Sequence, residues 1–78
     1  MREFWIQLNS MEDVEEFVAI ATARAFPISV RDNQHRVRGG CFMEMFCLDF
    51  TQPLRVEARC SEEELADLCA DAGKFLAG

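Results

Sequence analysis

Hydrophobic and polar positions alternate near the N-terminus and then recur at helical spacing. Phe4, Ile6 and Leu8 are separated by single polar or amphipathic residues, the period-two pattern of a strand with one face on a core. From residue 11 to residue 21, apolar side chains recur at helical intervals and acidic residues fill the other face. Ser10 precedes this stretch and belongs to the residue types that favour the N-cap position. The pattern predicts a strand and then a helix.

The next part of the chain has the pattern of a hairpin. Residues 26–31 alternate apolar and polar after Pro27, which cannot continue the helix. Asp32 and Asn33 tolerate the left-handed backbone of tight turns, and residues 34–38 are short and polar, which suits an edge strand. Two further strands are therefore expected, joined by a turn at Asp32 and Asn33.

Two helices and one strand are predicted in the remainder. Gly39 and Gly40 interrupt the pattern before residues 41–48, a mostly apolar stretch that favours a short helix of about two turns. Residues 54–58 alternate cleanly and predict a fourth strand. Ser61 and Glu64 form a capping box, and apolar positions through residue 76 predict a last helix.

These elements follow the order β α β β α β α within one domain, residues 1–78. Three helices on one face of a four-stranded antiparallel sheet form an open-faced two-layer α+β sandwich. The sequence is half apolar, with seven Phe and one Trp, which excludes a disordered chain. The spacing therefore predicts a folded domain with a single small core.

Charge and hydropathy narrow the classes of partner. The formal net charge is −6, so nucleic acid is not an expected partner, because phosphate binding needs a basic stripe. No apolar run reaches the roughly 18 residues of a membrane helix, and Met1 is not followed by a basic and then an apolar segment. We expect a cytoplasmic protein with no membrane contact.

The four cysteines give no sign of a metal site. Cys41, Cys47, Cys60 and Cys69 lie 6, 13 and 9 residues apart, and His35 is the only imidazole. Structural zinc sites use tighter clusters such as Cys-x-x-Cys. We expect buried, reduced thiols, no metal and no cofactor.

The element order resembles that of HPr, the histidine phosphocarrier of the bacterial sugar phosphotransferase system. The stretch from Gly40 to Phe50, Gly-Cys-Phe-Met-Glu-Met-Phe-Cys-Leu-Asp-Phe, is similar to the family's K-S-I-M-G-V-M-S-L-G segment around its second helix. From the second strand through Phe50 the two patterns run together without a gap. The resemblance implies an open-faced β-sandwich with strand order 1-4-2-3 and a carrier rather than an enzyme.

The sequence departs from the family where the family carries its chemistry. The family's G-x-H-A-R-P motif holds the phosphorylated histidine and an arginine at the start of the first helix. Ser10 and Glu12 stand at these two positions here, and the family's regulatory serine corresponds to Cys41. Imidazole is nucleophilic near neutral pH, and a serine phosphoester is too stable to pass its phosphate on. The substitutions predict a protein that does not transfer phosphate.

Partner binding is the function that the remaining residues favour. The family docks partner proteins with the exposed apolar residues of its second helix and the start of its first. Carried over, the partner-binding positions are the apolar Met11, Phe42, Met43 and Phe46 together with Glu12. Glu12, Glu15 and Glu44 form an acidic rim around the apolar residues. Met and aromatic side chains are typical interface anchors, although core packing alone also accounts for them. The partner would be a phosphotransferase-system protein, a transcriptional regulator or a second copy in a homodimer.

Two other readings stay open at this point. The chain is an active phosphocarrier if its acceptor is displaced to Ser10 or His35, although a solvated turn residue is the favoured interpretation of His35. It is a redox-responsive module if Cys41, at a helix start beside Cys47, has a reactive thiolate.

Overall fold

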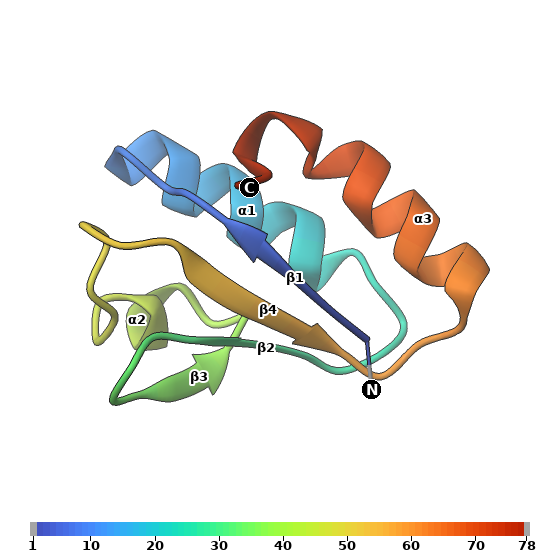
Figure 1. Cartoon of the computed structure of the whole chain (residues 1–78), viewed down its shortest axis with the longest axis horizontal. Coiled ribbons are helices and arrows are strands. Elements are labelled where there is room, and N and C mark those ends of the chain that lie inside the picture. The colour runs from blue at the N-terminus through green and yellow to red at the C-terminus, as the bar shows by residue number, and fades with distance from the viewer. Residues whose placement is uncertain (1, 78) are drawn as a thin grey trace.

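A computed structural model of the chain describes residues 2–77 and confirms the predicted order of elements. In chain order these are β1 (Arg2–Ile6), α1 (Met11–Thr22), β2 (Ile28–Arg31), β3 (Arg36–Arg38), α2 (Phe42–Met45), β4 (Leu54–Ala58), α3 (Glu62–Asp71) and a 3-10 turn, Gly73–Phe75. The strands form one antiparallel sheet in the order β1-β4-β2-β3, as expected, with β3 at an edge. The helices lie together on one face of this sheet, and its other face is open (Figure 1).

The core lies between the sheet and the helices, and strand alternation explains its composition. Inward positions of the central strands, such as Val30 and Val56, are wholly buried and pair across β2 and β4. Phe17 of α1 is also wholly buried, and its ring meets the edge of Phe75 with centroids 6.5 Å apart. Leu8 belongs to the core although β1 ends at Ile6. The same alternation sends the intervening polar residues to the open face.

Helix caps form where the sequence predicts them. Ser10 is the N-cap of α1, and its hydroxyl accepts a hydrogen bond from the Asp13 backbone N–H at 3.2 Å. Ser61 and Glu64 form a reciprocal capping box at the start of α3. Each cap satisfies backbone donors that the first helical turn leaves free, so these two helix starts are fixed locally.

Several predicted boundaries are wrong. The second helix has one turn, Phe42–Met45, instead of two, because the backbone tightens into a turn at residues 46–48. The last helix stops at Asp71, and Leu76 pairs in a bridge with Ile6. The two strands of the hairpin begin at Ile28 and Arg36, two residues later than the predicted segments 26–31 and 34–38. Residues 34 and 35 belong to the turn, because their backbone N–H groups donate to Asp32.

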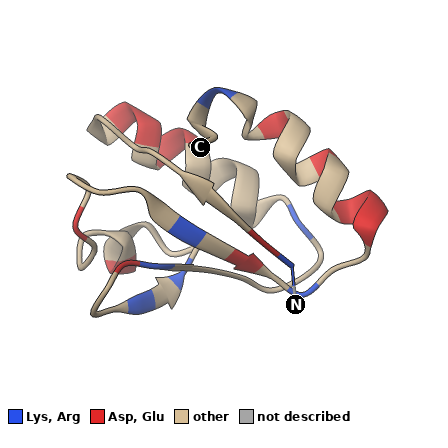
Figure 2. Cartoon of the chain, viewed as in Figure 1, with Lys and Arg blue, Asp and Glu red and all other residues tan. Residues whose placement is uncertain are grey.

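Charge is divided between the two layers. Helices α1 and α3 hold nine of the fourteen acidic residues and no Lys or Arg. The outward positions of the strands hold four arginines, Arg31, Arg36, Arg38 and Arg55. Figure 2 shows the acids along the two long helices and the arginines on the strands. The net charge of −6 therefore hides a sheet face that is locally basic.

Candidate functional site

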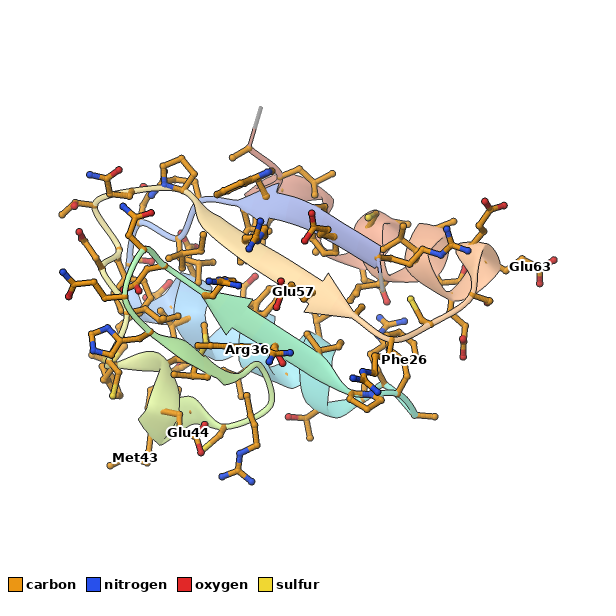
Figure 3. All side chains as sticks on the ribbon, turned by 60° about the horizontal axis from the view of Figure 1, so that its bottom comes forward. Phe26, Arg36, Met43, Glu44, Glu57 and Glu63 are labelled. Atoms are coloured by element: carbon orange, nitrogen blue, oxygen red, sulfur yellow. The ribbon has the colours of Figure 1, made fainter. Side chains whose placement is uncertain are left out.

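Helix α2 presents apolar side chains to solvent. Phe42 is half-buried against the core, and the Phe46 ring meets it edge-on with centroids 4.9 Å apart. Met43 is 75% exposed and Phe46 is 46% exposed. Met43 projects outward from α2 in Figure 3. Since apolar side chains this exposed gain little from folding, core packing accounts for Phe42 and not for the other two.

Met11, at the start of α1, is the other exposed member of the predicted patch, with 56% of its surface accessible. The start of α1 and helix α2 lie toward the same end of the molecule (Figure 1). The Gln7 side chain, just before α1, donates a hydrogen bond to the Phe50 carbonyl, just after α2, at 3.0 Å. This bond ties the two segments that flank the patch. We call Met11, Phe42, Met43 and Phe46 the apolar patch.

The acidic rim differs from the prediction at one residue. Glu12 and Glu15 are exposed on α1, as expected. Glu44 is not a free acid, because Arg38 binds its carboxylate with its backbone N–H at 3.0 Å and its guanidinium Nε at 2.9 Å. These hydrogen bonds lower the pKa of Glu44 and raise that of Arg38. The acidity beside the patch therefore comes from α1.

Acidic side chains occupy the start of α1. The Ser10 hydroxyl already serves as the N-cap, and the Asp13 carboxylate accepts the Asn9 backbone N–H at 3.0 Å. Glu12 and Asp13 occupy the first turn. Lys74 forms an ion pair with Glu16, one turn further along the helix. A phosphate on Ser10 would share the first turn with two carboxylates, and their like charges would repel it.

His35 lies in the β2–β3 turn, half exposed, with its Nδ1 atom 3.6 Å from a carboxylate oxygen of Asp32. Asp32 organises this turn. Its Oδ1 atom accepts the backbone N–H groups of Gln34 and His35 at 2.7 and 2.6 Å, and its Oδ2 atom accepts that of Asp49 at 2.9 Å. These backbone donors, first Gln34 and then His35, lower the pKa of Asp32 from 3.8 to about 2. The carboxylate thus joins the turn to the loop before β4.

Asp32→Asn is expected to destabilise the fold at neutral pH and not at very low pH. Because the folded-state pKa is depressed, the ionised carboxylate contributes stability above pH 3.8, and this contribution disappears as the pH falls to about 2. An asparagine amide nitrogen cannot accept the Asp49 N–H. Urea denaturation of both proteins across this pH range measures the effect.

The matched control is Asp67→Asn, on exposed α3, which should change stability little at either pH. Equal stability of Asp32→Asn and the unmodified chain at neutral pH would show that the turn does not depend on this charge.

The cysteines do not match the expectation of buried thiols. All four are free, and Cys47 is exposed while the others are half-buried. Burial raises the pKa of Cys60 and Cys69, which disfavours their thiolates. Cys41 is the N-cap residue of α2 and makes no side-chain cap hydrogen bond. Three of the four cysteines lie outside helices and strands, at the N-cap of α2, in the turn after it and in the loop before α3, where the core covers side chains only in part.

The cluster of charged side chains on the open face of the sheet was not predicted from the sequence. Figure 3 shows Glu57 and Arg36 on this face. Glu57 is only 8% exposed and lies 3.2 to 3.7 Å from guanidinium nitrogens of Arg31, Arg36 and Arg55. The signal was present, because strand alternation places these residues on one side. It could be read only after the strand register was known.

The described residues contain neither a cluster of metal-binding side chains nor a membrane-spanning helix. Within residues 2–77, no group of three or more His, Cys, Asp or Glu side chains is arranged to hold a metal ion. None of the helices in that range has both the length and the apolar character needed to cross a bilayer.

The fold is that of HPr. The crystal structure of HPr-C-His from Thermoanaerobacter tengcongensis superposes with a TM-score of 0.72 and 21% sequence identity, over 97% of this chain and 100% of that one. No family model matches the sequence, and no curated protein matches it. The likeness confirms the predicted open-faced sandwich and its strand order.

Proposed function

We propose that this chain is a phosphocarrier-family protein that no longer transfers phosphate and instead binds another protein through the apolar patch. The observation that carries the proposal is the exposure of Met11, Met43 and Phe46 beside an α1 start without histidine or arginine. Aromatic and Met side chains are the usual anchors of interfaces. The chain thus has exposed apolar residues suited to docking a partner, beside a helix start that lacks the histidine and arginine needed for phosphate transfer.

The charge around the patch indicates the chemistry of the partner. Glu12 and Glu15 leave the α1 side acidic, whereas Glu44 is neutralised by Arg38. A partner with a basic rim around an apolar surface is therefore favoured, because complementary charge speeds encounter and like charge rejects. Two copies meeting through this patch would oppose their own glutamates. A phosphotransferase-system protein or a transcriptional regulator with a basic face fits better than a homodimer.

A phosphotransfer assay tests the first half of the proposal. The chain is incubated with phosphoenolpyruvate and enzyme I, beside an authentic HPr as control, and both are weighed by mass spectrometry. We expect HPr to gain an acid-labile phosphoryl group and this chain to keep its unmodified mass, because the chain has no imidazole at the α1 start. An adduct on Ser10 or His35 would establish a displaced acceptor and refute the proposal.

Phe46→Asp tests the second half and is expected to abolish partner binding while the fold stays intact. The aspartate places a charge in the centre of the patch, where burial in an interface is costly without a paired cation. Partners captured by the unmodified chain are identified by mass spectrometry, and their affinity for both proteins is measured. A loss of 100-fold or more, roughly 3 kcal/mol, is the expected order of effect for an interface anchor.

Two further variants make this result specific. Met43→Asp, at the most exposed position of the patch, should weaken binding even if Phe46→Asp disturbs the Phe42 contact. Leu76→Asp changes a leucine that is 48% exposed near the C-terminus, outside the patch, and should bind normally. If Phe46→Asp and Met43→Asp bound the partner as tightly as Leu76→Asp and the unmodified chain do, the apolar patch would not be the docking surface.

A further inference from the structure

A pocket of about 520 Å³ lies at one end of the open sheet face and shares no lining residue with the apolar patch. Its walls come from four places: Trp5 of β1, the β2–β3 turn at residues 32–34, the loop before β4 at residues 49–53, and Ala77 near the C-terminus. A second hollow of about 190 Å³ shares Trp5, Asp32 and other walls with the first and adds Arg31 and Arg55. The two hollows together form one groove, within the usual size range of small-molecule sites.

The larger hollow is the anionic end of this groove. Asp32 and Asp49 line it, and none of its lining residues within the described range 2–77 is a Lys or Arg. Backbone donors lower the pKa of Asp32, and the Thr51 hydroxyl and backbone N–H lower that of Asp49. Both carboxylates therefore stay charged at neutral pH, and this end attracts a cation.

The smaller hollow is the cationic end. Arg31 and Arg55 line it, and with Arg36 they share the single buried carboxylate of Glu57. Glu3 approaches Arg55 only at 3.6 Å from an exposed position. The Nε atom of Arg55 is buried and has no hydrogen-bond partner within residues 2–77. Asp32 lines this hollow as well, so its lining holds two cations and one anion. The lining is therefore net positive and would attract an incoming carboxylate.

Trp5 lies where the two ends meet. It lines both hollows, and its side chain is half exposed. The Arg55 guanidinium lies 6.0 Å from the centroid of its ring. An exposed indole held by a cation offers a ligand a fixed apolar surface.

We propose that this groove binds a dipeptide with an apolar side chain, its ammonium group toward Asp32 and Asp49, its carboxylate toward Arg31 and Arg55, and its side chain against Trp5. A ligand of one sign would be attracted at one end and repelled at the other. Asp32 lines both hollows, whereas Asp49 lines only the larger one and Arg31 and Arg55 only the smaller one. A ligand that reaches from Asp49 to the arginines must extend through both hollows, which favours a dipeptide over a single amino acid. This site is separate from the partner-binding function proposed above.

Trp5 is the only tryptophan in the chain, so its fluorescence reports directly on the groove. The unmodified protein is titrated with alanyl-phenylalanine, with the N-acetylated form that lacks the ammonium group, and with the amide that lacks the carboxylate. We expect a saturable change with the dipeptide and binding at least about tenfold weaker for each blocked form, because each loses one charge contact. Free phenylalanine should also bind more weakly.

One variant at each end of the groove tests which charged group of the dipeptide binds there. Asp49→Asn should remove the preference for the dipeptide over its N-acetyl form, and Arg55→Gln should remove the preference over its amide. Asp67→Asn, on α3 in the other layer, should leave all the affinities unchanged. No saturable change with the unmodified protein, equal affinity for a blocked form, or tighter binding of free phenylalanine would overturn the proposal whether or not the variants fold.

Discussion

Replacing Phe17 with alanine is expected to remove most of the stability of the fold. Phe17 is wholly buried on the inner face of α1, and its ring packs edge-on against Phe75. Phe→Ala substitutions in cores cost about 3–5 kcal/mol, through lost burial and the cavity left behind. A domain of this size rarely has more than about 3–5 kcal/mol from its core, so the variant should be largely unfolded in water.

Circular dichroism in a urea series measures this loss. The matched control is Met43→Ala, which also removes a large apolar side chain but from a position 75% exposed, and should stay within about 0.5 kcal/mol of the unmodified chain. If Phe17→Ala unfolded at the same urea concentration as the control, the core would not depend on the contact between α1 and the C-terminal turn.

The order and sides of the elements could be predicted because they depend on local patterns. The alternation in residues 54–58 is sufficient to identify β4, and Ser10 and Ser61 fix their helix starts through bonds to residues three positions away. Information of this kind is contained in short stretches of sequence.

The ends of elements could not be predicted, because they depend on contacts distant in sequence. Just before α2, the Gly40 carbonyl accepts a hydrogen bond from the Thr22 hydroxyl of α1 at 3.4 Å. The chain after α3 turns to pair Leu76 with Ile6, and the Ala77 N–H donates to the Trp5 carbonyl at 2.9 Å. Periodicity within a segment carries no sign of either partner.

Part of the candidate site could likewise be predicted from local sequence, and part depended on contacts distant in sequence. The exposure of Met43 and Phe46 agrees with the prediction, because a helix of this length cannot bury four large apolar side chains on one side. The pairing of Glu44 with Arg38 was missed, since the turn between β3 and α2 had to be known first. The open-face groove was missed because its walls come from four separate segments.

Glu57→Gln is expected to destabilise the protein although the new side chain has nearly the same shape. Glu57 is 8% exposed and forms ion pairs with Arg31, Arg36 and Arg55, which share it as a counter-charge. Removing its charge leaves three guanidinium groups close together with no carboxylate between them. Losing one partner of a buried ion pair costs about 3–5 kcal/mol, but these arginines are 30–53% exposed and water screens them. We therefore expect a loss of about 2 kcal/mol.

Raising the salt concentration and substituting the neighbouring Glu3 test whether the effect of Glu57→Gln comes from its charge. Glu3 lies opposite Glu57 across β1 and β4 and reaches Arg55 at 3.6 Å, but it is 49% exposed, so Glu3→Gln should cost less than about 0.5 kcal/mol. Repulsion among the arginines is screened by ions, so raising the salt concentration to about 1 M should recover part of the loss in Glu57→Gln. A loss that does not change with salt would mean that Glu57 acts through packing and hydrogen bonding. A loss equal to that of Glu3→Gln would mean that the arginine cluster does not need a buried counter-charge.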